Sequence, residues 1–235
     1  MNGIRQRYMN NKTLKTQRQH SAEASGGISN ESIYKLFERT LMEFDLKGDL
    51  LDFGAGTGHL IQRLQKLKRF RITTTDLMDR PSCLDDSIKW FRADLNEPIG
   101  TGDNSFDVIV SAEVIEHLEN PRAVIREWFR LLRPGGKLIF STPNNESWRS
   151  ILALLWRGHF VMFGDTCYPA HITAILRKDI QRILQEVGFC KPVFIFSNSG
   201  GIPKLPQITW QSISFGLFKG MRFSDNLLVL TEKPS

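Results

Sequence analysis

The sequence predicts an α/β fold in which a mostly parallel sheet carries helices on both faces. Short apolar segments alternate with segments of helical periodicity over most of the chain after residue 29. Turn residues, such as the Pro-Gly-Gly at 134–136, separate them. Aspartates follow several of the apolar segments, and parallel sheets bind ligands beyond the carboxyl ends of their strands.

The expected helices and strands follow one another in a regular order. Asn30 and Asn120 are suitable N-caps, and Pro121 occupies a first helical position, where proline is favoured. The expected helices cover 30–46, 59–67, 121–132 and 178–187. The expected strands cover 49–53, 70–75, 88–92, 106–111, 137–141, 192–196 and 227–231.

Length and composition bound the class of protein. The 235 residues are 41% hydrophobic and 24% charged, which suits one globular domain and excludes a disordered, collagen-like or coiled-coil chain. Cys83, Cys167 and Cys190 are too few for a disulfide framework and fit no zinc spacing, so we expect free thiols. No apolar run reaches the roughly 18 residues of a membrane span, and the N-terminus lacks a secretory signal. A soluble, cytoplasmic protein is expected.

The basic character of the chain is concentrated at its N-terminus. The chain has 31 basic and 25 acidic residues, and residues 1–20 hold five of the basic ones and no acid. The remaining 26 basic residues nearly balance the acids, so the rest of the chain is about neutral. We expect a flexible basic tail over 1–28, which is either solvated or in contact with phosphates or an anionic membrane. One domain follows over 29–235.

A segment at about 145–175 interrupts the alternation and is expected to be an insertion. Its stretch 151–163 is apolar but broken by Arg157-Gly158-His159, so it is too short and too polar to span a membrane. Three roles stay open. The segment would be a lid that binds the acceptor, an amphipathic segment in peripheral contact with a membrane, or an element packed on the sheet edge.

A glycine-rich loop joins the first expected strand to its helix. It reads Asp52-Phe53-Gly54-Ala55-Gly56-Thr57-Gly58, and such glycines let a ligand approach the main chain closely. The dinucleotide fingerprint requires a glycine where His59 stands, which disfavours a nicotinamide oxidoreductase. Asp76 closes the second strand, where a carboxylate can accept hydrogen bonds from both ribose hydroxyls. Asp94 closes the third strand, where it would accept a hydrogen bond from an adenine amino group.

Together with further motifs, this loop resembles the class I S-adenosylmethionine-dependent methyltransferases over about 50–188. The motifs are LLDFGAGTG at 50–58, TTTD at 73–76, RADL at 92–95, FDVIVSAEVIEHL at 106–118 and LLRPGGKLIFSTPN at 131–144. The resemblance implies a Rossmann-like, seven-stranded, mostly parallel sheet with an antiparallel C-terminal hairpin. A weaker similarity points to the O-methyltransferases of ubiquinone biosynthesis.

The resemblance also implies a site for S-adenosylmethionine. The residues around the methionine end of the cofactor would be Asp52, Gly54, Ala55, Gly56 and Gly58. Asp76 would hold the ribose. The residues beside the adenine and on the floor of the site would be Leu77, Asp94, Leu95, Ser111 and Ala112.

Glu113, Glu116 and His117 form a second cluster after the fourth strand. In a helical turn they would share one face, and two carboxylates with an imidazole suit Mg²⁺ or Mn²⁺, with His171 as a further ligand. Similar clusters occur in ubiquinone-biosynthesis O-methyltransferases and in small-RNA 2′-O-methyltransferases, where they look like metal sites. Many methyltransferases of this fold carry such a stretch without a metal. We therefore favour His117 as a base or acceptor-positioning residue, with Glu113 and His171 as further candidate catalytic residues.

The favoured function is O-methylation of a hydroxylated small-molecule, glycan or lipid-linked acceptor. The order of STPN, the apolar insertion and AHI at 170–172 resembles methyltransferases that act on such acceptors. A second hypothesis is an RNA methyltransferase that uses the Glu/His cluster as a metal site, but nucleic acid is not favoured because 145–235 shows no RNA-binding module. A third is a non-catalytic regulator that binds S-adenosylmethionine. The sequence indicates neither the acceptor nor the oligomeric state.

Overall fold

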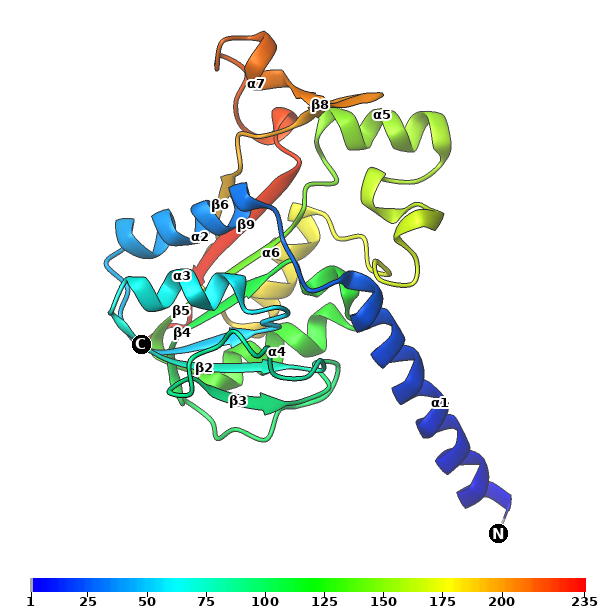
Figure 1. Cartoon of the computed structure of the whole chain (residues 1–235), viewed down its shortest axis with the longest axis vertical. Coiled ribbons are helices and arrows are strands. Elements are labelled where there is room, and N and C mark those ends of the chain that lie inside the picture. The colour runs from blue at the N-terminus through cyan, green and yellow to red at the C-terminus, as the bar shows by residue number, and fades with distance from the viewer. Residues whose placement is uncertain (1) are drawn as a thin grey trace.

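A seven-stranded sheet lies at the centre of the computed structural model, which describes residues 2–235, with side chains from residue 13 onward (Figure 1). The strand order is β3-β2-β1-β4-β5-β9-β6. The strands are β1 (Gly48–Phe53), β2 (Phe70–Asp76), β3 (Lys89–Arg92), β4 (Phe106–Ala112), β5 (Leu132–Pro143), β6 (Val193–Phe196) and β9 (Asn226–Glu232). Strands β1 to β5 pair in parallel, and β9 runs antiparallel between β5 and β6. The predicted seven-stranded, mostly parallel sheet is confirmed.

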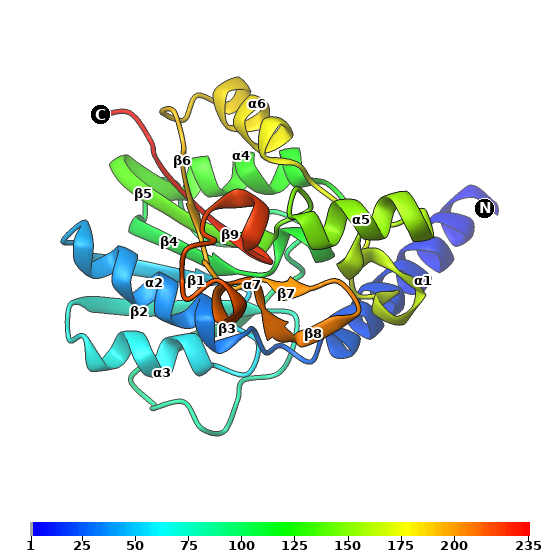
Figure 2. The same ribbon diagram turned by 90° about the horizontal axis from the view of Figure 1, so that it is seen from above.

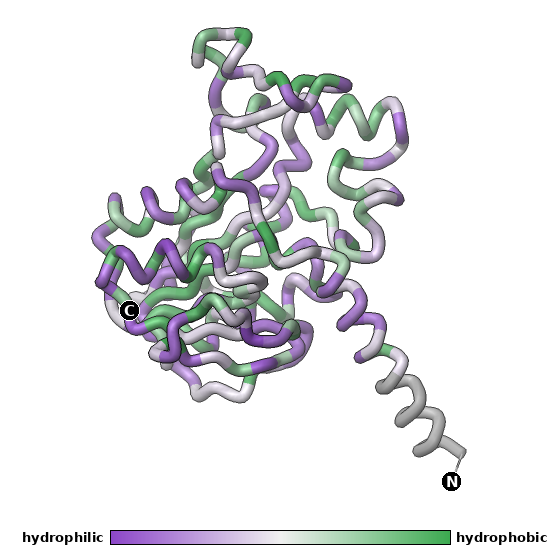
Figure 3. Tube along the Cα trace, in the orientation of Figure 1, coloured by the Kyte–Doolittle hydropathy of each residue, from purple (hydrophilic) through white to green (hydrophobic). Residues whose placement is uncertain are grey.

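Two pairs of helices cover the two faces of the sheet (Figure 2). One face carries α2 (Glu31–Glu43) and α3 (His59–Lys66), and the other carries α4 (Pro121–Leu131) and α6 (Arg177–Val187). Each pair buries its own apolar cluster against the central strands, which form a markedly hydrophobic part of the trace (Figure 3). The side chains of Asn30 and Asn120 accept backbone hydrogen bonds at the starts of α2 and α4, as predicted.

The connection between the last two strands is longer than a simple hairpin. Strands β6 and β9 pair as antiparallel neighbours, but residues 197–225 leave the sheet between them. This excursion forms β7 (Gly201–Ile202), β8 (Leu205–Thr209), α7 (Trp210–Ile213) and the 3₁₀ turn η4 (Met221–Phe223). The rings of Trp210, Phe218 and Phe223 pack together, so a small separate cluster holds this excursion.

The predicted insertion is largely helical. Its first part is α5 (Trp148–Arg157), which ends at Gly158 with a left-handed φ of 78°. Two 3₁₀ turns follow, η2 (Val161–Phe163) and η3 (Asp165–Cys167). The stretch 151–163 therefore comprises most of α5, an amphipathic helix, and a separate turn, and its contact with a membrane stays a prediction. Across residues 2–235, no helix has the length and apolar character that crossing a membrane requires.

The N-terminal segment, for which the sequence predicted a flexible basic tail, forms a helix, α1 (Asn2–Ser25). Arg18 holds the end of α1 to the domain through ion pairs with Asp94, Glu97 and Glu119. These partners are far from Arg18 in the sequence, which is why composition alone did not indicate them. The predicted flexibility of 1–28 and the domain boundary at 29 stay predictions.

Candidate functional site

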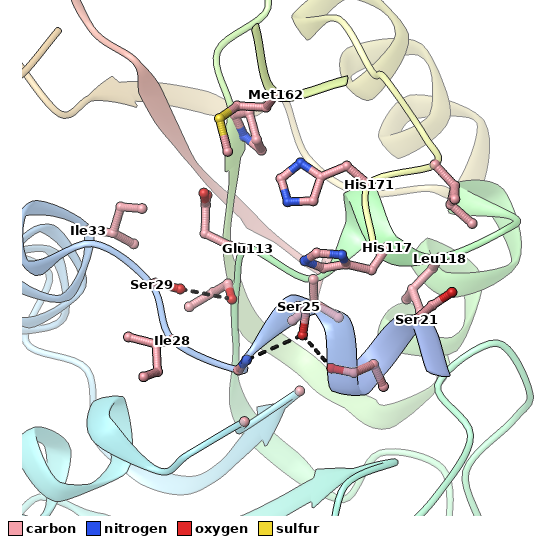
Figure 4. A pocket seen from close by; sticks show the side chains of 18 of the residues that line it. Ser21, Ser25, Ile28, Ser29, Ile33, Glu113, His117, Leu118, Met162 and His171 are labelled. Atoms are coloured by element: carbon pink, nitrogen blue, oxygen red, sulfur yellow. Dashed lines mark hydrogen bonds between the residues drawn. The ribbon is translucent and has the colours of Figure 1, made fainter. Parts of the chain in front are cut away.

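A cavity of about 840 Å³ lies at the carboxyl ends of the sheet strands. The ends of β1, β2 and β4 line it, together with α1, the segment that joins α1 to α2, and the insertion. Figure 4 shows Glu113, His117 and His171 near one another in this cavity, with Ser21 and Ser25 of α1 beside them. The predicted position of the site, at the carboxyl edge, is where the structure places the cavity.

The predicted glycine loop connects β1 to α3 along the cavity. Gly54, Gly56 and Gly58 have left-handed φ angles of 91°, 50° and 81°. A Cβ atom at Gly54 would overlap Val114, and one at Gly56 would overlap the main chain of Gly27. The loop therefore requires these glycines for its own geometry and packing, before any ligand is considered.

Asp52, at the end of β1, is an acid without a partner. It is 1% exposed, and neither carboxyl oxygen has a hydrogen-bond partner among the residues that the structure describes. Burial, together with the charge of Asp76, raises the pKa of Asp52 to about 8. A buried carboxyl group without a partner costs folding free energy, which a cationic ligand group would offset. The carboxyl group of Asp52 therefore fits S-adenosylmethionine, because the ammonium and sulfonium groups of that cofactor are positive.

Asp76 and Asp94 lie at the strand ends where the sequence predicted them. One oxygen of Asp76 accepts a hydrogen bond from the Gly56 N–H and the other from the Met78 N–H, both at 2.8 Å. Asp94 accepts hydrogen bonds from the Asn96 N–H at 3.0 Å and from Arg18 at 2.8 Å. Because a carboxylate has about four acceptor positions, these fixed groups can still accept hydrogen bonds from a ligand.

All the predicted cofactor residues except Gly58 and Ser111 line the cavity. Those that line it are Asp52, Gly54, Ala55, Gly56, Asp76, Leu77, Asp94, Leu95 and Ala112. Ser111 is buried behind it and donates its hydroxyl hydrogen to the Phe53 carbonyl, which joins β4 to β1. Gly58 is the N-cap of α3, and a Cβ there would press on Leu84. These two residues support the site from behind instead of forming its wall.

The chain after β4 does not start the helical turn that the sequence predicted at Glu113. Glu113 has a left-handed φ of 56°, and the 3₁₀ turn η1 (Ile115–His117) begins only afterwards. The Glu113 carboxylate accepts a hydrogen bond from Asn226 at 2.8 Å, and burial raises the pKa of Glu113 to about 7. Glu116 is completely buried, and this burial, with the charge of Glu113, raises the pKa of Glu116 well above its ordinary value.

Glu116, His117 and His171 form a compact group. One ligand atom from each lies within 4.8 Å of the others, and the centroids of the two imidazole rings are 4.7 Å apart. The backbone N–H groups of Ile172 and Thr173 donate to the Glu116 carbonyl, which holds the end of the insertion against η1. Among the described residues this group does not include Glu113, and the predicted set of four metal ligands stays a prediction.

The protonation of this group suits either a base or a metal ion. Nδ1 of His117 lies 2.8 Å from the Ala170 carbonyl oxygen, so we assign the proton to Nδ1 and the lone pair to Nε2. Burial lowers the pKa of His117, and burial with the proximity of His117 lowers the pKa of His171 to about 4. Neither carboxyl oxygen of Glu116 has a hydrogen-bond partner within residues 13–235. Neutral imidazoles beside an unpaired carboxyl group therefore fit a divalent cation as well as a general base.

The contribution of the N-terminal segment to the cavity was not predicted from the sequence. Arg18, Ser21 and Ser25 line it from α1. Apolar periodicity identifies residues that pack in the core, and these polar residues face a cavity. Asn226 was missed for another reason, because it lies 113 positions from Glu113 in the sequence.

The fold and the site together define a class of protein. A glycine loop and strand-end acids around one cavity at the carboxyl edge of a parallel sheet are typical of enzymes that bind a nucleoside. Residues 26–190 match the family described as a methyltransferase domain, and the chain belongs to the class I S-adenosylmethionine-dependent methyltransferases. S-adenosylmethionine is the cofactor of these enzymes.

Two curated relatives illustrate the sequence similarity. The ubiquinone biosynthesis O-methyltransferase of Xanthomonas oryzae pv. oryzae (strain PXO99A) is 31% identical over 165 residues, which are 60% of this chain and 69% of the relative. The mitochondrial ubiquinone biosynthesis O-methyltransferase of Dictyostelium discoideum is 28% identical over 124 residues, which are 46% of this chain and 39% of the relative.

Solved structures share the fold at low sequence identity. A SAM-dependent methyltransferase from Archaeoglobus fulgidus superposes with a TM-score of 0.64 at 16% identity, over 90% of this chain and 97% of that chain. The phosphoethanolamine N-methyltransferase 2 of Haemonchus contortus, in complex with S-adenosyl-L-methionine, superposes with a TM-score of 0.58 at 14% identity. The superposition covers 86% of this chain and 53% of that chain. Similarity at this level supports the architecture alone.

Replacing Asp52 with Asn should stabilise the ligand-free protein, by at least about 1 kcal/mol near pH 8. The pKa of Asp52 is raised from 3.8 to about 8, so between these values the folded chain holds a proton that the unfolded chain releases. Wild-type stability at this site therefore falls as the pH rises, and Asp52→Asn removes the fall. Urea denaturation at about pH 5 and about pH 8 measures both free energies. A variant less stable than wild type at the higher pH would contradict this assignment.

Proposed function

We propose that the protein transfers a methyl group from S-adenosylmethionine to a hydroxyl oxygen of a small-molecule acceptor. Family membership supports methyl transfer, and the relatives named ubiquinone biosynthesis O-methyltransferases support oxygen as the accepting atom. The observation that carries the proposal is His117, which lines the cavity and whose Nδ1 lies 2.8 Å from the Ala170 carbonyl oxygen, a tautomer that leaves the lone pair on Nε2 to receive the hydroxyl proton.

The carboxyl edge of the sheet would hold the cofactor along its length. Asp52 would face the ammonium group, and the glycine loop would lie beside the methionine part. Asp76 would accept hydrogen bonds from the ribose hydroxyls. Leu77 and Leu95 would enclose the adenine, whose amino group would donate to Asp94. When bound, the sulfonium supplies an already activated methyl group.

The residues of this chain would contribute position, exclusion of water and removal of a proton. Met162, His171 and Ile172 border the cavity on the side of the insertion, where the acceptor would enter. Holding the acceptor oxygen in line with the methyl group turns an encounter into an oriented reaction. As the new oxygen–carbon bond forms, the hydroxyl proton would pass to Nε2 of His117, whose ring the Ala170 carbonyl orients.

A divalent cation is a second way to activate the hydroxyl group. Mg²⁺ or Mn²⁺ would be held by Glu116, His117 and His171, and a bound cation lowers the pKa of a coordinated hydroxyl. Glu113 would then act from outside the metal group, through its hydrogen bond with Asn226.

An RNA acceptor and a purely regulatory role find less support. The basic segment 1–20 favours RNA by its charge, but Arg18 of this segment is engaged by three carboxylates at the cavity. A regulator that only binds S-adenosylmethionine would need the residues that hold the cofactor and no further reactive group. The group of buried Glu116 and half-buried His117 and His171 has perturbed pKa values that binding of the cofactor does not require.

An exposed apolar surface beside the cavity supports a lipid-linked acceptor. Leu155 and Trp156 of α5 are 78% and 84% exposed, and Phe215 and Leu217 of the excursion are 95% and 82% exposed. The two segments meet where Lys204 lies 5.5 Å from the Trp156 ring. No acidic residue occurs in 147–164 or 187–224, whereas both contain Lys or Arg. Exposed apolar groups among cations suit an anionic membrane surface, which we propose as the partner of this face.

Replacing Asp76 with Ala should weaken the binding of S-adenosylmethionine at least about tenfold, because charge-assisted hydrogen bonds to the ribose are lost. Isothermal titration measures the affinity. Asp79→Ala is the matched control, since Asp79 is three residues further on and its side chain is 88% exposed. An unchanged affinity in Asp76→Ala would remove Asp76 from the cofactor site.

Replacing His117 with Gln should lower kcat by about 10²–10⁴-fold with short-chain hydroquinones as acceptors, while the affinity for S-adenosylmethionine stays unchanged. Because burial lowers the pKa of His117, wild-type turnover should decline only at acidic pH, where the imidazole becomes protonated. A chelator separates the two mechanisms. Turnover that survives saturating chelator excludes the metal, and turnover that is lost and restored by Mg²⁺ or Mn²⁺ excludes a metal-free base.

Replacing both Trp156 and Phe215 with Ser should reduce binding to phosphatidylglycerol-containing vesicles at least about tenfold, since each exposed aromatic side chain buries apolar area in the bilayer interface. Co-sedimentation with vesicles measures the bound fraction. Met42→Ser is a control, because Met42 is an exposed apolar residue of α2, away from this face. Equal binding by the double variant and the wild type would contradict a membrane-facing role.

A further inference from the structure

The end of α1 forms part of the wall of the cofactor cavity. Arg18, Ser21 and Ser25 line the cavity together with Asp94 and Leu118. Figure 4 shows Ser21, Ser25 and Leu118 of this wall. The family match begins at residue 26, so α1 lies outside the matched domain. This wall is therefore a contribution of this chain that the family match does not describe.

One side chain holds this wall in place. Nη1 of Arg18 donates to Asp94 at 2.8 Å and to Glu97 at 2.9 Å. Its Nε and Nη2 donate to the two carboxylate oxygens of Glu119 at 2.9 and 2.7 Å. The last contact is a bidentate pair, the strongest geometry for a guanidinium and a carboxylate. We call these contacts the latch, and residues 13–25 of α1 the cover.

The cover joins the domain through two glycines of different character. The Gly27 carbonyl accepts hydrogen bonds from both the N–H and the hydroxyl of Thr57, each at 3.0 Å, so Gly27 is fixed to the glycine loop. A Cβ at Gly56 would also overlap Gly27. Gly26 has a left-handed φ of 69°, and a Cβ there would meet no described atom within 4 Å. Gly26 therefore lies between Gly27, which is anchored, and Ser25, the last residue of α1. A glycine at this position can serve as a hinge about which α1 turns relative to the domain.

We propose that the cover closes the adenosine end of the cofactor site, pivots at Gly26 and is held shut by the latch, so that the cofactor exchanges when the latch opens. This proposal rests on the assignment of the cavity to S-adenosylmethionine. It also gives Arg18 a second task. By neutralising Asp94, the acid assigned to the adenine, Arg18 couples closure of the cover to the orientation of a binding residue.

The test is the rate at which labelled S-adenosylmethionine leaves the protein in a filtration chase. Arg18→Ala should release it roughly tenfold faster, because several charge-assisted hydrogen bonds hold the closed state. Glu119→Gln should act in the same direction. Lys15→Ala removes a charge from the same helix outside the latch and should keep the wild-type rate. Raised salt should speed release from wild type and have little effect on Arg18→Ala, because exposed ion pairs are screened. A merely structural Arg18 would not give this salt dependence.

A second measurement separates failure of this proposal from failure of the proposed function. Hydrogen–deuterium exchange of residues 13–25 in the ligand-free protein should be faster in Arg18→Ala than in Lys15→Ala, which shows that the latch holds the cover. If wild type binds S-adenosylmethionine and Arg18→Ala releases it at the wild-type rate, the cover proposal is wrong and the methyltransferase assignment stands. If wild type binds no S-adenosylmethionine, both are wrong. If exchange in residues 13–25 is equal in all variants, the latch is wrong, whatever the cofactor does.

Discussion

Carboxyl groups gathered at the carboxyl edge of the sheet, several of them buried, are the constraint on which the rest of the site depends. The acids that follow β1, β2 and β4 meet at this edge because these strands run in parallel and end side by side. Burial raises the pKa of Asp52, Glu113 and Glu116, so the folded chain keeps carboxyl groups where their ionisation is costly. Such an edge is unsuited to phosphate. It suits ligands that bring positive charge or hydrogen-bond donors.

Some of these acids have partners in the protein and others have none among the described residues. This difference suggests which parts of a ligand each acid would face. Asp94 is paired with Arg18, and Asp76 is held by two N–H groups of the main chain. Asp52 and Glu116 have no hydrogen-bond partner within the described part of the chain. The acids with partners suit neutral, hydrogen-bonding parts of a ligand. The others are the acids to which we assign positive groups in our proposal, Asp52 to the methionine end of the cofactor and Glu116 to a cation at the acceptor side.

The sheet and the strand-end acids were predictable because their signals are local. Each strand has its own apolar run, Asn30 and Asn120 cap the helices that follow them, and Asp76 directly ends its strand. Other features depend on contacts between distant residues, which a single sequence does not display. Arg18 and Glu119 are 101 positions apart, for example. The left-handed backbone of Glu113 is another such feature, because its N–H donates to the Ser141 hydroxyl on β5 instead of starting a helix.

The sequence predicted the glycine loop and the strand-end acids, which form the floor of the site, better than it predicted the cover. Residues of the floor must turn tightly or end strands, so their types are restricted, whereas the cover needs only polar side chains and one well-placed cation. The resulting charge pattern matches the assigned cofactor along its length. Arg18 pairs with Asp94, which we assign to the neutral adenine, and Asp52, which we assign to the positive methionine end, has no hydrogen-bond partner among the described residues. In this assignment, loss of the methyl group would remove the sulfonium charge near Asp52 and leave only the ammonium charge. The attraction that favours the loaded cofactor is then weaker for the product, which favours exchange in the direction of turnover.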